Sequence, residues 1–478
     1  MVEREIISEF MVNGILLAPE AIDYLDENED LRSVLLDEAR KEKLPTFLSL
    51  QEVKSRELER ISIPVPEVRG VPLPGPLPEV KLVEPQPLSA DLRFQIDRER
   101  DITGRSTSEG EFKDFLTYFR ARYTTMRRLF RRRRELIGSL PITKAKRMDD
   151  VRIIGIVRDI RKGPRSLFVT IEDESSEIGV TIPLDKNVLL MGDEVIGVIG
   201  RRRGERVIAS EVIFPDVPQN PRNRSKNDAH LLIMSDTHFG SFNFIWDSWR
   251  SFVSKMDGME PKIDCMLIAG DLVDGVGIYP GQKEDLEVKS VYDQYELAAA
   301  ELDELPHEMK IFLQPGNHDY VRLAEPQPAL PEEISSIFSN NIIHIGNPSY
   351  INIEGVDILS YHGSGLDDYL PALNIPYTKP LEGMKAMLKR RHLAPLYGGK
   401  TPIAPESKDY LVIDKIPDIF VTGHVHGSGA AMYRGVIMVS GSTFQSQTSY
   451  QKMMNFVPDP GNFLVLNLRD MSSGRVVV

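Results

Sequence analysis

Five apolar runs in the second half of the chain each end in residue types that bind metals. The segments are "LLIMSDTH", "CMLIAGDLVDG", "IFLQPGNHD", "ILSYHGSG" and "IFVTGHVHGSG". Such runs predict buried strands, and polar side chains beyond the ends of parallel strands meet at one edge of a sheet. Taken singly, an aspartate after a strand is commonly a turn residue and a lone histidine a core residue. Five of the nine histidines lie in these clusters, which favours one shared site: His238, His318, His362, His424 and His426.

Metal binding is the chemistry that this combination suits. Carboxylates and imidazoles that converge in a partly desolvated cleft leave charge unpaired unless a cation is present. Imidazole, carboxylate and amide ligands together suit manganese, iron or zinc better than calcium, which prefers oxygen alone. One carboxylate can bridge two ions about 3.5–4 Å apart, and such a pair polarises a phosphoryl group and generates hydroxide near neutral pH. The pattern thus predicts two divalent ions and hydrolysis of a phosphate ester.

The order D-x-H, GD-x-x-D, GNHD, a later histidine and GH-x-H resembles the motifs of the calcineurin-like metallophosphoesterases. The resemblance implies seven metal ligands, divided between two ions and one bridge. One ion would be held by Asp236, His238 and His426, and the other by Asn317, His362 and His424, with Asp271 bridging. Manganese is the expected metal, with magnesium, iron and zinc as alternatives.

The same resemblance assigns catalytic roles beside the metals. His318 matches the family's non-ligating histidine, which stabilises the transition state and protonates the leaving oxygen, a general-acid role. Asp319 would orient His318, although capping of the turn is an equally good reading. Asp274 is expected to be structural.

The elements that must position this site are expected in residues 228–478. From about residue 230, strand-like runs alternate with helical segments, which is the pattern of a layered α/β domain with its site at the strand ends. The resemblance implies the metallophosphoesterase β-sandwich flanked by helices.

Five short strand-like segments precede this domain, within residues 148–217. They are "VRIIGIVRDI", "SLFVTIED", "EIGVTIPL", "DEVIGVIGRR" and "ERVIASEVIF", separated by turn residues. Five such strands predict a small barrel of the OB type. OB barrels often stack the bases of single strands on aromatics, but Phe168 is the one aromatic within these strands before Phe214, so a structural barrel is favoured.

The N-terminal part divides into three segments. Apolar residues at helical spacing predict a small helical domain over residues 1–50, and a proline-rich linker follows over 51–90. Residues 91–147 are expected to carry a basic amphipathic helix leading into the barrel, with its aromatic residues on one face and arginines on the other. Whether those arginines are merely solvated or contact phosphate is left open.

Composition restricts the classes of function. The net charge of -13 argues against a protein that coats nucleic acid generally, despite the basic stretch "RARYTTMRRLFRRRR". The single cysteine, Cys265, excludes an internal disulfide framework and suits a reducing compartment. No apolar stretch approaches the roughly 20 residues that span a bilayer, and the charged start "MVEREIISEF" does not match a signal peptide. We expect a cytoplasmic protein with no membrane partner.

The order of an OB fold followed by a phosphoesterase resembles the B-subunits of replicative DNA polymerases. In eukaryotic members the metal ligands are eroded, whereas here all seven positions are filled, as in the small subunits of archaeal family-D DNA polymerases. Segments such as "GSTFQSQTSYQKMMNFVPDPGNF" resemble that family, and the resemblance covers about residues 90–478. It implies a metal-dependent 3′-5′ exonuclease that proofreads primer-template 3′ ends within a heterodimer. The large catalytic subunit would supply DNA synthesis and much of the DNA-binding surface.

Several alternatives stay open. The chain would be a non-catalytic scaffold if the site were inactive, or a stand-alone phosphoesterase if it acted on small esters. Arg390 and Arg391 are candidate contacts to the DNA backbone, although they also suit a helix C-terminus through its dipole. A sliding clamp is a further candidate partner, but "QKMMNF" resembles a clamp-binding peptide only faintly, and such a contact would as readily reside on the large subunit.

Overall fold

The computed structural model describes residues 92–478 apart from 220, 221, 280, 454 and 455, together with short stretches between residues 10 and 48. The chain divides into two units, residues 1–84 and 85–478. In the first unit, β1 (Leu16–Leu17) pairs in parallel with β2 (Phe47–Leu48). Apart from these stretches, the expected helical domain and proline-rich linker lie outside the described residues. Within the described part, no helix is long and apolar enough to cross a membrane.

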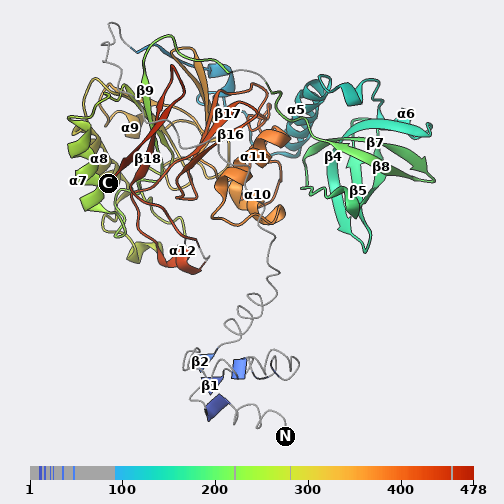
Figure 1. The fold of residues 1–478 in the computed structure, drawn as a ribbon, viewed down its shortest axis with the longest axis horizontal. Coiled ribbons are helices and arrows are strands. Elements are labelled where there is room, and N and C mark those ends of the chain that lie inside the picture. Colours follow the sequence, from blue (N-terminus) through green and yellow to red (C-terminus); the bar gives the residue numbers. More distant parts are fainter. Residues whose placement is uncertain are drawn as a thin grey trace. The chain divides into compact units, whose positions relative to one another are not determined.

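Two six-stranded sheets form the body of the second unit (Figure 1). The first has the order β12 (Ile342–His344), β11 (Lys310–Gln314), β10 (Cys265–Ala269), β9 (His230–Met234), β18 (Asn462–Asn467), β19 (Ser473–Val477). The second has the order β16 (Gly429–Tyr433), β17 (Val436–Ser440), β15 (Ile419–Thr422), β14 (Val356–Ser360), β13 (Ser349–Ile353), β3 (Phe94–Ile96). Strands β9 to β12 are parallel, as are β14, β15 and β17.

Alternating side chains of the buried strands explain the layers. Successive residues of a strand face opposite sides of the sheet. In β9, Leu231 and Ile233 enter an apolar core shared by both sheets, whereas Leu232 and Met234 pack beneath helices α7 (Trp246–Met256) and α8 (Val291–Asp303). Helices α10 (Leu366–Ala372) and α11 (Pro380–Arg390) cover the second sheet. The predicted α/β class is therefore confirmed.

The five strands before this body close into a barrel. They are β4 (Asp150–Lys162), β5 (Ser166–Glu172), β6 (Glu177–Pro183), β7 (Val195–Arg203) and β8 (Arg206–Ile213). Their order around the barrel is β4-β5-β6-β8-β7, with β6 and β8 parallel. Inward-facing aliphatic residues such as Val169, Val180 and Val198 fill the interior. The predicted OB-like barrel is thus confirmed.

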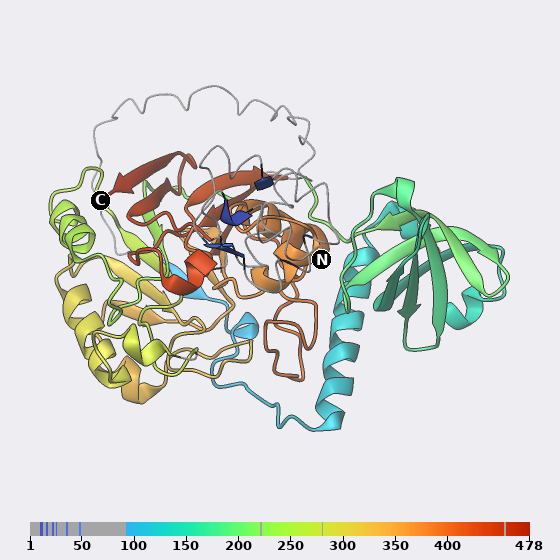
Figure 2. The same ribbon diagram turned by 90° about the horizontal axis from the view of Figure 1, so that it is seen from below.

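Helix α5 (Phe112–Phe130) packs against both the barrel and the two-sheet body (Figure 2). Its N-terminus is closed by a reciprocal capping box between Glu111 and Asp114. The expected amphipathic helix is confirmed, but Arg122 lies on the buried face, because a carboxylate of the body, Asp409, neutralises it at 2.7 Å. The remaining short helices are η1 (Arg98–Arg100), η2 (Arg134–Leu136), α6 (Ile142–Ala145), η3 (Leu184–Lys186), η4 (Gln282–Glu284), α9 (Glu332–Ser335) and α12 (Ser449–Met453).

Candidate metal centre

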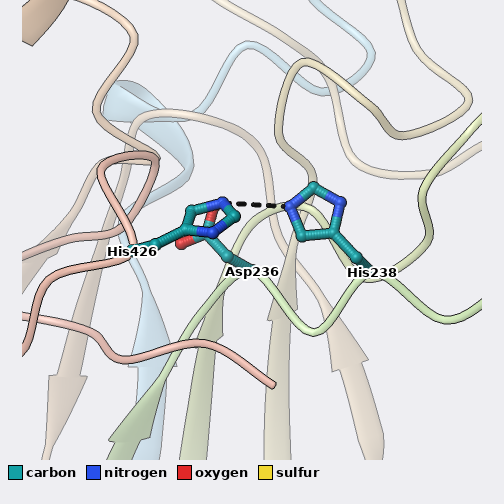
Figure 3. Close-up of side chains that lie close together, drawn as sticks. All are labelled: Asp236, His238 and His426. Atoms are coloured by element: carbon teal, nitrogen blue, oxygen red, sulfur yellow. Dashed lines mark hydrogen bonds and ion pairs between the residues drawn. The ribbon is translucent and has the colours of Figure 1, made fainter. Parts of the chain in front are cut away.

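The seven predicted ligands lie on loops that follow the carboxyl ends of five parallel strands. These strands are β9, β10, β11, β14 and β15. The loops gather Asp236, His238 and His426 into one cluster (Figure 3). They gather Asp271, His362 and His424 into a second cluster, and Asn317 Oδ1 lies 3.0 Å from His362 Nε2.

The distances place Asp271 between the two clusters. Its Oδ2 lies 3.8 Å from His238 Nε2 in the first cluster and 3.4 Å from His362 Nε2 in the second. The Nε2 atoms of His238 and His426 face each other at 3.2 Å. Two imidazole nitrogens approach in this way only when a proton or a cation separates their lone pairs. The donor set therefore fits two divalent ions with a shared carboxylate.

The backbone at the ligands adopts a conformation that non-glycine residues seldom take. Five of the seven ligands have positive φ: Asp236 (51°), His238 (55°), Asp271 (52°), His424 (68°) and His426 (50°). Residues in this left-handed region cost about 1–3 kcal/mol each and cluster at functional sites, where the surrounding structure enforces them. The strain supports the interpretation of these loops as a site.

Two glycines let the ligands approach the backbone closely. A Cβ at Gly316 would lie 2.2 Å from Asp271 Oδ1, and a Cβ at Gly270 would lie 2.2 Å from His362 Nδ1. Any side chain at either position would displace a ligand. The glycines are thus required by the packing of the centre, and Gly270 also has φ +93°.

Burial and mutual charge set the protonation of the cluster. Burial raises the pKa of Asp236. At Asp271 burial also opposes ionisation, but the neighbouring imidazoles of His362 and His318 hold the pKa well below its usual range. Asp271 in turn outweighs burial at His362 and raises its pKa to about 10. Without a metal the carboxylate of Asp271 is balanced by protonated His362, so binding of a divalent cation to this pair would release a proton.

Each histidine ligand has a second partner beside its ring, which is an acceptor at three of them and the amide N–H donor of Gln451 at His426. Such outer contacts orient metal-bound histidines in known sites. Asp274 and Asp367 supply carboxylates, Gln451 an amide and Ala269 a carbonyl. The contacts are His238 Nδ1 to Asp274 Oδ1 at 3.0 Å, His362 Nδ1 to Ala269 O at 2.9 Å, His424 Nε2 to Asp367 Oδ2 at 3.1 Å and His426 Nδ1 to Gln451 Nε2 at 3.0 Å. The sequence pattern did not reveal Asp367 and Gln451, for which no motif exists, and indicated only a structural role for Asp274.

His318 lies at the rim of the centre. Its ring stands perpendicular to that of His238, with centroids 4.7 Å apart, and its Nδ1 lies 2.7 Å from the carbonyl oxygen of Asp274. If Nδ1–H donates to the carbonyl of Asp274, the other ring nitrogen, Nε2, points away from that carbonyl. Nε2 makes no hydrogen bond with any residue that the structure describes. Burial lowers the pKa of His318.

Asp319 takes the second of the two roles considered for it, since its carboxylate caps backbone N–H groups of the loops rather than orienting the ring of His318. Its Oδ2 accepts hydrogen bonds from the main-chain N–H groups of Leu272 and Gly316, and its Oδ1 accepts one from Tyr295. The carboxylate therefore joins the loops after β10 and β11. The carbonyl of Asp274 holds the ring of His318 instead.

Arg390 and Arg391 are buried, which corrects the predicted DNA contact. Arg390 donates to Glu194 Oε2 at 2.7 Å and packs on the ring of Phe214. Arg391 donates to the carbonyl oxygen of Ile413 at 2.6 Å. Arg390 thus joins the body to the barrel, and Arg391 joins it to the segment after the barrel through a hydrogen bond to the carbonyl oxygen of Asp216 at 3.4 Å. Both guanidinium groups are buried, so phosphate does not reach them.

The segment "QKMMNF" does not present a free clamp-binding peptide. Its glutamine, Gln451, is buried against His426, and its aromatic residue, Phe456, is 9% exposed. A sliding clamp would have to bind these two side chains, but both are already buried within this chain.

Comparison with known proteins gives consistent matches. A family model that describes the alpha/epsilon B-subunits of DNA polymerases matches residues 231–428. A protein of Archaeoglobus fulgidus named DNA polymerase II small subunit is 39% identical over 472 residues, which cover 96% of this chain and 94% of that protein. Proteins of the same name from Methanothermobacter thermautotrophicus and Thermoplasma acidophilum are 36% and 33% identical; the matches cover 97% and 99% of this chain and 98% and 92% of those proteins.

Proposed function

The chain belongs to the family of archaeal DNA polymerase II small subunits, with a role in DNA replication, and from this premise we propose that it carries the metal-dependent 3′-5′ exonuclease of the polymerase. It would hydrolyse the terminal phosphodiester of a DNA 3′ end, as a proofreading nuclease, in a heterodimer with the large catalytic subunit. Residues 228–478 would be a calcineurin-like metallophosphoesterase domain, following an OB-fold domain over 148–217.

The observation that carries this proposal is the complete ligand set with its outer contacts. Asp236, His238 and His426 would hold one ion, Asn317, His362 and His424 the other, and Asp271 both. When bound, the ions, of which manganese suits the donors best, would polarise the scissile phosphodiester. A scaffold has no need of five strained ligands or of partners that fix each imidazole.

His318 is the residue proposed to move a proton. Water adds its oxygen to phosphorus and releases one proton to solvent, and the bond from phosphorus to the 3′-oxygen breaks. That oxygen takes the Nε2 proton of His318 in its imidazolium form, and solvent then protonates the ring again. The Asp274 carbonyl would support this direction, because it occupies Nδ1 and leaves Nε2 toward the substrate. A mismatched 3′ end frays more cheaply than a paired one, so it would enter the centre more often.

Removal of this imidazole is expected to slow hydrolysis without removing metal. For His318→Ala we expect kcat to fall by about 10²–10⁴-fold, the usual contribution of a general acid. The decisive assay is digestion of a 3′-mismatched primer-template with manganese, using each protein with and without the large subunit. His307→Ala is the matched control, since His307 is exposed and outside the site.

Stepwise 3′ shortening by wild type, retained by His307→Ala and lost by His318→Ala at equal metal content, would support the nuclease. If no wild-type preparation shortens the primer despite confirmed metal occupancy, the scaffold is correct. If mononucleotide esters are cleaved and DNA ends are not, the chain is a small-ester phosphatase.

Two aromatic side chains, the half-buried Tyr279 and the exposed Phe242, favour DNA over a small ester. The ring of Tyr279 lies 6.5 Å from that of His318, and Phe242, four residues beyond His238, is 64% exposed. Asp285 fixes both residues: its Oδ2 accepts the Tyr279 hydroxyl at 3.0 Å, and its main-chain oxygen accepts the N–H of Phe242 at 3.0 Å. Such rings stack unpaired bases.

We therefore expect Tyr279→Ala to raise KM for single-stranded DNA by about tenfold, since stacking contributes about 1–3 kcal/mol per base. Steady-state kinetics on an oligonucleotide would measure this, with bis(p-nitrophenyl) phosphate as the substrate that lacks a base. Tyr279→Phe, which keeps the ring and loses the hydroxyl, is the control and should resemble wild type. An equal loss on both substrates would contradict stacking and indicate a disturbed centre.

A further inference from the structure

A groove lies between α5 and the segment 407–414, apart from the metal ligands. It encloses about 600 Å³. Arginine, lysine and hydroxyl-bearing side chains provide most of its lining, so the groove offers mainly hydrogen-bond donors. They are Arg100, Thr117, Arg120, Thr124, Thr125, Arg128, Tyr350, Ser407, Lys408 and Tyr410.

The two carboxylates of the groove are already neutralised. Asp409 pairs with the buried Arg122 at 2.7 Å, and Asp414 pairs with Arg100 at 2.7 Å. By contrast, Arg120 and Arg128 are exposed and form no ion pair with any residue that the structure describes. The groove consequently carries an excess of positive charge in a chain whose net charge is -13.

Helix α5 holds these cations at a fixed spacing. Arg120, Thr124 and Arg128 follow each other at intervals of four residues, so they lie on one face of the helix, and exposed Arg132 continues the row just past its end. The opposite face, including Tyr118 and Met126, is buried. Because the buried face is held in place by packing, the face that carries the arginines cannot turn away from the groove.

We propose that this groove binds the sugar–phosphate backbone of DNA. Arginine, lysine, threonine, serine and tyrosine are the side chains that contact phosphate in protein–DNA complexes, and a phosphodiester offers acceptors to every one of them. A row of cations at regular spacing suits a polyanion better than a single small anion. The inference rests on the proposed action on DNA, and it assigns to α5 a DNA contact that the net charge of -13 does not by itself predict. An acidic segment of a protein partner is the competing occupant.

The test measures equilibrium binding rather than hydrolysis, so it is separate from the test of the nuclease. Fluorescent primer-templates of two unrelated sequences would be titrated with the full chain in EDTA, at salt concentrations between about 50 and 200 mM. For Arg120→Ala/Arg128→Ala we expect weaker binding of both sequences to the same extent. The slope of log K against log salt should fall by about 2, since each phosphate contact contributes about 1.

Two further proteins make the result decisive. Arg469→Ala/Arg475→Ala removes two exposed arginines from the β18–β19 hairpin and serves as the charge-matched control. Thr124→Glu places a carboxylate between Arg120 and Arg128 without shortening either side chain, and we expect it to reproduce the loss.

Equal affinity and slope for the groove variants and the control would overturn the proposal. So would normal DNA binding together with lost co-purification of the large subunit, which would identify a protein occupant. Weakened DNA binding in both groove variants, with the control unchanged, would support it even if no preparation hydrolysed DNA.

Discussion

Asp271→Asn is expected to lower the rate of the proposed exonuclease by at least about 10³-fold and to abolish paired metal binding. The carboxylate stands within 3.8 Å of a histidine from each cluster, so it is the one ligand that both ions would share. An amide carries no charge and bridges two cations poorly. Metal ions contribute several kcal/mol of charge stabilisation to phosphoryl transfer, and about 4 kcal/mol corresponds to 10³-fold in rate.

Metal binding gives a readout independent of the reaction. Manganese at about 100 times its Kd should stabilise the wild-type protein by about 2.7 kcal/mol, whereas the variant should show a much smaller thermal shift. Metal content after desalting would be measured by mass spectrometry, with Asp303→Asn, an exposed aspartate at the end of α8, as control. A variant that retained two ions per chain would remove Asp271 from the bridging position.

The local pattern of the sequence was sufficient to predict that these aspartate and histidine side chains gather at one site, which they do. Each ligand follows a strand by a few residues, and parallel strands place such positions at one edge. The assignment of each ligand to one ion or the other came instead from the resemblance of motifs such as GNHD to those of the calcineurin-like metallophosphoesterases. Local sequence patterns were likewise sufficient to predict the barrel, since its strands are short, alternate between apolar and polar residues and are bounded by turns.

The sequence pattern could not predict the hydrogen-bond partners of long polar side chains. Arg122 binds Asp409, which lies 287 residues away, so no local pattern could reveal its partner. Arg390 was read as a surface cation for the same reason, because its acceptor, Glu194, belongs to the barrel. Only the packing of one element on another decides such contacts. The same holds for Asp367, whose role depends on the position of His424.

The buried Arg122 also carries the prediction with the largest effect on stability. Its guanidinium donates to Asp409 at 2.7 Å and to the carbonyl oxygen of Pro395, and both charged side chains are almost fully inaccessible. Burial opposes ionisation of Asp409, but His392 and Arg122 hold its pKa well below the usual range. The ionised carboxylate of Asp409 therefore contributes its full stabilisation above about pH 3.9, the pKa of an aspartate in the unfolded chain. This contribution is lost as the pH falls below that value.

For Asp409→Asn we expect the free energy of unfolding at neutral pH to fall by about 3–5 kcal/mol, because the substitution leaves a buried guanidinium without its counter-charge. The midpoint of urea unfolding would measure this, again with Asp303→Asn as control. Arg122→Met/Asp409→Leu separates charge from packing: replacing both partners by apolar side chains is often neutral, so the double variant should recover much of the loss. A double variant less stable than Asp409→Asn would show that packing and the bonds to backbone carbonyls, rather than the unpaired charge, dominate where α5 meets the body.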